Sequence, residues 1–231
     1  MFGVMFDDKH SYDDFGLIYN TKTISEPVVQ KKYVSVPGRN GAIDLSEVLT
    51  GNPRYDDREI AIQFTIMEPF PKWEQKRSEI AQALHGQKMR IVFDDDKAFY
   101  WLGRIEVGEV KPEGSTASIE ISAIVDPYKY NIATSAEDWL WDPFDFEYGV
   151  INETANMLVN GTLSYTLITS QRWENPIIVS DVAMNLEVDG QTFEIAAGSQ
   201  VLYELILTEG EHTFTFTGNG TVTINYVGGM L

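Results

Sequence analysis

Apolar residues at every second position are the pattern that most restricts how this chain can fold. In REIAIQFTIM (58–67) and STASIEISAIV (115–125), alternate residues are apolar and fall on one face. This period of two is typical of strands that bury one side and expose the other. The run 88–110 predicts two more strands around the acidic turn Asp94-Asp95-Asp96. Much of the chain is therefore expected to build antiparallel sheet.

One segment, KWEQKRSEIAQALHG (72–86), has helical spacing instead. Trp73, Ile80 and Leu84 recur on one stripe, and Gly86 follows the last apolar position, where it can supply a left-handed cap. The first part of the chain is therefore predicted to be an α+β domain, an antiparallel sheet or split barrel that carries a single helix.

The second part predicts an all-β domain. After residue 160, short alternating strands follow one another, and the pairs Asp189-Gly190 and Asn219-Gly220 are typical of tight turns between strands. Short strands at such spacing, without a helical pattern, favour a β-sandwich or a jelly roll.

Charge separates the two parts. The chain has a formal net charge of −18, and residues 134–231 carry one basic residue, Arg172, against 14 acidic ones. This step predicts a domain boundary, with domains at 1–133 and 134–231. Because so acidic a surface repels phosphate backbones, we expect no nucleic-acid binding, and the acidity is expected to serve solubility or a basic partner. No apolar run is long enough for a membrane span, and the first residues, MFGVMFDDKH, do not form a signal peptide.

The residues with catalytic potential form no recognisable constellation. The three histidines lack metal-ligand spacing, no cysteine is present, and no phosphate loop, nucleophile elbow or dinucleotide fingerprint occurs. Asp94 to Asp96 favour a solvated turn over a calcium loop. We therefore expect no enzyme activity, no metal and no cofactor. Acidic and aromatic residues around Trp141 leave open either a linker pinned to a neighbour or a carbohydrate site.

The stretch VSVPGRNGAIDL (34–45) places a Pro-Gly turn inside a strand-like run, and a long loop follows it. Its glycines permit positive φ, whereas its apolar residues have no evident local core. Two interpretations remain from the residues alone, a loop that folds back on its own domain or an arm that contacts another molecule.

Several segments together resemble siphophage distal tail proteins. These are FDDKHSYDDFGLIY (6–19), VSVPGRNGAIDLSEVLTGNPRYDDREIAIQF (34–64), the helix with Trp73, and VDPYKY (125–130). The resemblance covers about residues 1–130, and it continues loosely through Asn175-Pro176 and the ending YVGGML.

The resemblance implies a structural virion protein. Distal tail proteins form a ring at the distal end of a non-contractile tail, and the ring is expected to be a hexamer. It joins the major tail tube protein to the tail-associated fibre or lysin protein. The ring serves as a baseplate hub for receptor-binding proteins and is assembled in the host cytoplasm. The second domain would be an outward-facing sandwich, galectin-like or jelly-roll.

The resemblance also makes the segment from about Val36 to Arg58 an intersubunit arm. Its expected contact residues are Pro37, Gly38, Arg39, Gly41, Ile43, Leu45, Val48, Leu49 and Tyr55. The alternative function is carbohydrate binding during host-surface adhesion, with stacking contacts from Trp141, Trp173 and Tyr203.

Overall fold

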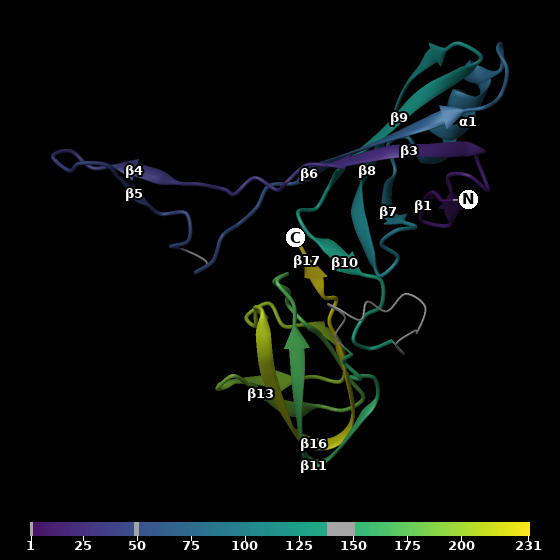
Figure 1. Ribbon diagram of the computed structural model, residues 1–231. Helices are drawn as coiled ribbons and strands as arrows, with labels where there is room; N and C mark the ends of the chain where they lie inside the picture. The colour runs from purple at the N-terminus through teal and green to yellow at the C-terminus, as the bar shows by residue number, and fades with distance from the viewer. Residues whose placement is uncertain (1, 49–50, 138–150) are drawn as a thin grey trace. The chain divides into compact units, whose positions relative to one another are not determined.

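The computed structural model of the protein describes residues 2–48, 51–137 and 151–231 (Figure 1). The chain forms two compact units. Unit 1 is Met1–Asp96 with Trp101–Pro127, and unit 2 is Lys97–Tyr100 with Tyr128–Leu231. The described residues are mostly antiparallel strands with one α-helix, so the predicted β-rich fold with a single helix is confirmed. Among these residues, no helix combines the length and apolar character that crossing a membrane requires.

Unit 1 contains α1 and the first nine strands. Seven strands of a nine-stranded sheet follow the order β2-β1-β7-β8-β9-β6-β3, and β4 pairs with β5 in a separate two-stranded sheet. The other two strands, β10 and β17, belong to unit 2, where β10 pairs with β17 and with Phe99 and Tyr100 at the start of β8. The bounds are β1 Val4–Phe6, β2 Lys9–His10, β3 Leu17–Ile24, β4 Tyr33–Ser35, β5 Ala42–Asp44, β6 Arg58–Ile66, α1 Trp73–Leu84, β7 Lys88–Phe93, β8 Phe99–Glu113 and β9 Thr116–Val125.

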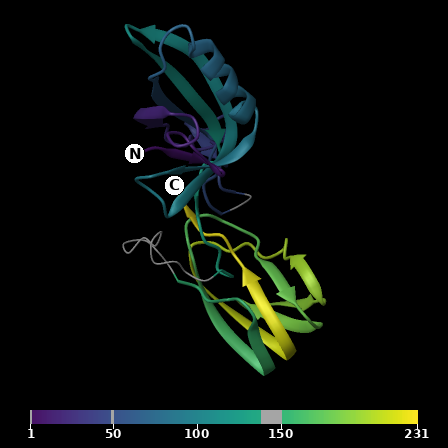
Figure 2. The ribbon, with the colours of Figure 1, turned by 90° about the vertical axis from the view of Figure 1, so that its right-hand side faces the viewer.

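The core of unit 1 follows the alternation seen in the sequence. Strands β6 and β9 pair Phe64 with Ile119, and the other alternate residues of both strands are buried on the same face. Helix α1 lies along the sheet (Figure 2) and buries Trp73, Ile80 and Leu84. Gly86 follows the helix with φ +76°, as predicted for a left-handed cap. Burial of one face by alternate apolar residues thus fixes the register of the sheet.

The sheet of unit 1 curls so that its two ends approach each other. The ring of Phe2, just before β1, meets Tyr19 of β3 edge to face with 5.0 Å between centroids. Lys22 of β3 places its Nζ 2.7 Å from Asp95 Oδ1 and 4.0 Å from the centroid of the Phe93 ring. Side chains, rather than the backbone ladder, join these ends, because β2 and β3 terminate the strand order.

Unit 2 is organised around one long antiparallel pair of strands, β11 and β16, which are separated in the chain by β12 to β15. Strands β11 and β16 pair from Met157↔Val222 to Thr169↔Gly210, and the other edge of β16 pairs with β13 and then with β12. The bounds are β10 Lys129–Asn131, β11 Met157–Thr169, β12 Ile177–Ser180, β13 Met184–Val188, β14 Gln191–Ile195, β15 Gly198–Val201, β16 Gly210–Asn225 and β17 Gly229–Met230.

The two turn predictions of unit 2 have different outcomes. Asp189-Gly190 joins β13 to β14 with φ of 50° and 79°, which confirms the predicted tight turn. The prediction for Asn219-Gly220 is wrong, because both residues lie inside β16, where Asn219 pairs with Asn160. A Cβ on Gly220 would lie 2.5 Å from Val182 Cγ2 and still closer to Asp181 Oδ1, so these side chains would have to shift to admit another residue.

Candidate functional site

The β4–β5 hairpin ends in a turn that the sequence specifies. The amide of Arg39 donates to the carbonyl of Val36 at 3.2 Å, which closes a four-residue turn. Pro37 supplies the fixed φ of the second position, and Gly38 adopts φ +82° at the third. This is the arrangement of a type II turn, in which the third position requires positive φ. Gly41 has φ +78° where the chain turns into β5.

Solvent surrounds the hairpin. Every residue from Lys31 to Asn40 is exposed, including Tyr33 at 58%. On the returning segment Ile43 and Leu45 are half-buried, whereas Val48 is 68% exposed. Such apolar exposure on an extended segment is typical of a surface that contacts another molecule.

A narrow stem holds the hairpin away from the sheet of unit 1 (Figure 1). Val29 pairs with Tyr55 in an isolated bridge, and the amide of Gln30 donates to the carbonyl of Arg54 at 2.8 Å. On the outgoing segment only Tyr33–Ser35 has a continuous partner strand. Leu49, another predicted arm residue, lies outside the described residues.

Arg58 fixes the base of the stem. Its side chain is 5% exposed, Nε donates to the carbonyl of Ser25 at 2.7 Å, and Nη1 donates to the carbonyl of Pro127 at 3.2 Å. The guanidinium also lies 4.9 Å from the ring centroid of Trp101. Desolvation lowers the pKa of the Arg58 guanidinium, and the nearby Glu26 carboxylate partly opposes that shift. In the sequence Arg58 is marked only as the end of the arm, and no local signal indicates this anchoring role.

Of the three residues predicted for sugar contact, two are described. Tyr203 is 79% exposed, Trp173 is half-buried, and Trp141 lies outside the described residues. The segments that carry Trp173 and Tyr203 are neighbours, because Asn175 Nδ2 donates to the carbonyls of Tyr203 and Leu205 at 3.2 and 2.8 Å. Tyr203 thus presents most of its ring to solvent from a turn that the side-chain amide of Asn175 holds in place.

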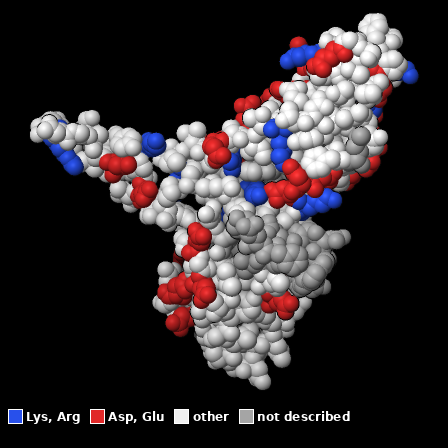
Figure 3. Space-filling view, viewed as in Figure 1, with Lys and Arg blue, Asp and Glu red and all other residues white. Residues whose placement is uncertain are grey.

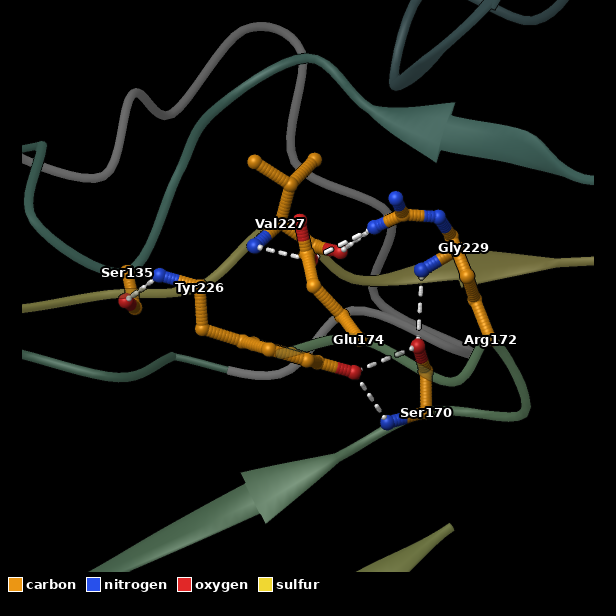
Figure 4. Close-up of polar contacts among 7 residues, drawn as sticks. All are labelled: Ser135, Ser170, Arg172, Glu174, Tyr226, Val227 and Gly229. Carbon is orange, nitrogen blue, oxygen red and sulfur yellow. Dashed lines mark hydrogen bonds and ion pairs between the residues drawn. The ribbon is translucent and has the colours of Figure 1, made fainter. Parts of the chain in front are cut away.

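A polar network in unit 2 engages Arg172, the one cation of residues 134–231 (Figure 4). Arg172 Nη1 lies 2.5 Å from Glu174 Oε2 and donates to the carbonyl of Val227 at 2.9 Å. The guanidinium also stacks 4.6 Å from the ring centroid of Tyr130. These contacts tie the segment after β11 to the end of the chain.

Tyr226 completes that network. Its hydroxyl accepts the amide of Ser170 at 2.9 Å and lies 3.0 Å from Ser170 Oγ. Burial raises the pKa of the Tyr226 phenol, while the bonds from Ser170 oppose the shift. The network thus consists of a tyrosine, a serine and an arginine-carboxylate pair, and its hydrogen bonds hold neighbouring segments together.

The acidic turn Asp94 to Asp96 is occupied by protein contacts. The amide of Gly3 donates to Asp94 Oδ2 at 2.8 Å, and His10 Nε2 lies 3.2 Å from the same oxygen. Among residues 2–48, 51–137 and 151–231, no group of three His, Cys, Asp or Glu side chains is arranged to hold a metal ion.

Comparison with known proteins gives two matches. The family model described as a phage tail protein RIFT-related domain matches residues 14–130, more than half of the chain. Among solved structures, the chain resembles the Dit protein of SPP1, described as a paradigm of the hub adsorption apparatus in phages that infect Gram-positive bacteria. That match has a TM-score of 0.62 at 13% identity and covers 100% of both chains. No curated protein matches the sequence significantly.

Proposed function

Because the chain belongs to the family of phage tail proteins with a RIFT-related domain, we propose that it is the hub of the distal tail. In this proposal six copies close a ring at the end of a non-contractile tail. The ring joins the major tail tube protein to the tail-associated fibre or lysin protein and works in the virion after assembly in the host cytoplasm. The full-length similarity to the SPP1 hub protein supports the assignment at the level of the fold.

The β4–β5 hairpin is the observation that carries the proposal. From Ser25 to Val36 the outgoing segment spans about 36 Å if extended at about 3.3 Å per residue. A compact unit of about 120 residues has a radius of gyration of only about 14 Å. A projection of that length, exposed along its tip, can reach a neighbouring copy. A contact of this head-to-tail kind closes into a ring when the rotation between copies closes.

The two units then have separate roles. Unit 1, which we propose to be a split barrel, builds the ring, since it carries the arm. Unit 2, proposed to be a galectin-like or jelly-roll sandwich, offers an acidic surface to basic receptor-binding or accessory baseplate proteins. Tyr203 is an exposed aromatic residue on that surface and is available as a contact. Exposed ion pairs would make the binding of such partners weaken as salt rises.

Deletion of the arm tests this function. In the test variant a short Gly-Ser linker replaces residues 27–56, which keeps Arg58 and its contact with Ser25. Wild-type protein is expected to form rings visible by negative-stain electron microscopy, with a matching mass in solution. The arm-deleted chain is expected to be a folded monomer, because the proposed contact is gone. Rings of unchanged order in the deletion variant would contradict the role given to the arm.

A further inference from the structure

The outgoing strand of the arm differs in charge from the rest of the protein. Residues 27–43 contain Lys31, Lys32 and Arg39 and no acidic residue, whereas the returning segment carries Asp44, which pairs with Tyr33, and Glu47. The three cations are exposed, and blue atoms are visible at the free end of the hairpin in Figure 3. Exposed apolar residues accompany them, chiefly Tyr33 and Val36. A surface that receives this outgoing strand should therefore be acidic and should offer apolar side chains.

One surface of unit 1 has these two properties. The β1–β2 hairpin and the turn after it, residues 7–14, contain four aspartates, at positions 7, 8, 13 and 14. Phe2 and Tyr12 are exposed beside them, at 42% and 38%. His10 joins this segment to the acidic turn of residues 94–96, since it lies 3.2 Å from both Asp13 Oδ2 and Asp94 Oδ2. We call Phe2, Tyr12 and the aspartates of residues 7–14 the acidic seam.

The acidic seam also lies at one end of the strand order of unit 1. Strand β2 terminates that order, and no further strand among the described residues pairs with its outer edge. The contact of Phe2 with Tyr19 fills the space toward β3, so the hairpin would cover the seam from outside and not enter the sheet. An exposed strand edge is a place where an extended segment can dock.

The arm and the acidic seam occupy different ends of unit 1. In Figure 1, β4 and β5 lie at one end of the unit and β1 at the other. A closed ring of identical copies needs two unlike, complementary surfaces on each copy. The other exposed apolar residues of unit 1 include Met67 and Phe70, but Glu68, Lys72, Glu74 and Lys76 give the chain around them a balanced charge. Charge therefore favours the acidic seam over this segment.

We infer that the acidic seam of one copy receives the β4–β5 hairpin of the next copy, with Lys31, Lys32 and Arg39 facing the aspartates. This inference rests on the proposed ring function and adds the identity of the receiving surface. The apolar contacts would come from Tyr33 and Val36 against Phe2 and Tyr12. Charge pairs at such an interface raise the rate of encounter and fix the register of the two copies.

Two charge-reversed variants separate the two halves of the contact. The arm variant is Lys31→Glu with Lys32→Glu, and the seam variant is Asp8→Lys with Asp13→Lys. Both sets are exposed, so each variant should keep the urea unfolding transition of the wild type. Glu109→Lys with Glu113→Lys is the matched control for the seam variant, because it makes the same charge change on exposed residues near the β8–β9 turn.

Each reversed variant is expected to lose ring formation, with self-association at least tenfold weaker by sedimentation velocity, and the control is expected to assemble normally. An equal mixture of the two reversed variants should form mixed rings, because the wild-type arm of the seam variant matches the wild-type seam of the arm variant and the reversed arm matches the reversed seam. A chain that carries all four reversals should form rings again.

These experiments distinguish a failure of the seam contact from a failure of the proposed arm function. Normal rings from the seam variant, with loss of rings in the arm variant, would overturn the inference and leave the arm function in place. Normal rings from both reversed variants and from the arm-deleted chain would overturn both. A wild-type chain that stays monomeric at every attainable concentration would likewise count against both.

Discussion

Replacing Arg58 by methionine tests how the arm is anchored to unit 1. The substitution keeps an unbranched side chain and removes the cation. Two backbone carbonyls in partly buried positions, those of Ser25 and Pro127, then lose their donor. Hydrogen bonds that involve a charged group contribute about 1.5–3 kcal/mol each, and the bond to Pro127 belongs at the low end because it is 3.2 Å long.

Two other contacts of Arg58 change the expected loss of unfolding free energy little. The stacking of Arg58 on Trp101 contributes roughly 0.5–1 kcal/mol, and the pair with Glu26 contributes almost nothing because that carboxylate is 93% exposed. Removal of the cost of burying the cation offsets part of the loss. We expect unit 1 to lose about 2–4 kcal/mol of unfolding free energy.

Hydrogen exchange under increasing urea measures this loss in the full chain, because peptides from β6 and β16 report the two units separately. Only the β6 peptides should exchange faster. Arg104→Met is the matched control, since Arg104 is exposed and donates to the carbonyl of Gly86, and it should cost about 0.5 kcal/mol. Arg58→Lys should fall between the two, because an ammonium group does not reproduce the fork of donors. Equal losses from Arg58→Met and Arg104→Met would refute the anchoring role.

Three further predictions concern the arm tip and unit 2. Gly41→Val forces a β-branched residue to φ +78° at a cost of about 1–3 kcal/mol within the hairpin, so ring yield by electron microscopy should fall while the melting temperature stays unchanged; unchanged ring yield would count against the arm. Arg172→Met should lower the unfolding free energy of unit 2, measured in urea, by about 2–3 kcal/mol, since Glu174 loses its partner. A loss below about 0.5 kcal/mol, which is typical of an exposed ion pair, would contradict the role given to this network. Because the pKa of Tyr226 is raised in the folded state, the unfolded chain releases this proton first, and unit 2 should keep its full stability below about pH 10 and lose stability as the pH rises through the folded-state pKa. Tyr226→Phe should flatten this fall in unfolding free energy. An identical slope in the variant would contradict the assignment to Tyr226.

The sequence predicts unit 1 well because local pattern and tertiary packing agree there. Alternate apolar residues in 58–66 and 116–125 become the buried face of β6 and β9, and the stripe with Trp73 becomes the buried face of α1. The turn Val36 to Arg39 is also predictable, since a type II turn requires positive φ where Gly38 stands.

Sequence reasoning fails where distant residues decide the structure. Asn219-Gly220 has turn chemistry, but the long partner strand β11 carries β16 straight through it. The anchoring of Arg58 depends on Ser25 and Pro127, which are far from it in sequence. The network of Arg172 was similarly hidden, although its position as the one cation in an acidic half was a usable signal.

Electron microscopy of the purified full-length chain, with its mass measured in solution across concentration, tests the central claim most directly. The account predicts six-fold rings with a central channel and a mass of six chains at high concentration. A particle that keeps the mass of one 26.1 kDa chain at every concentration would contradict it.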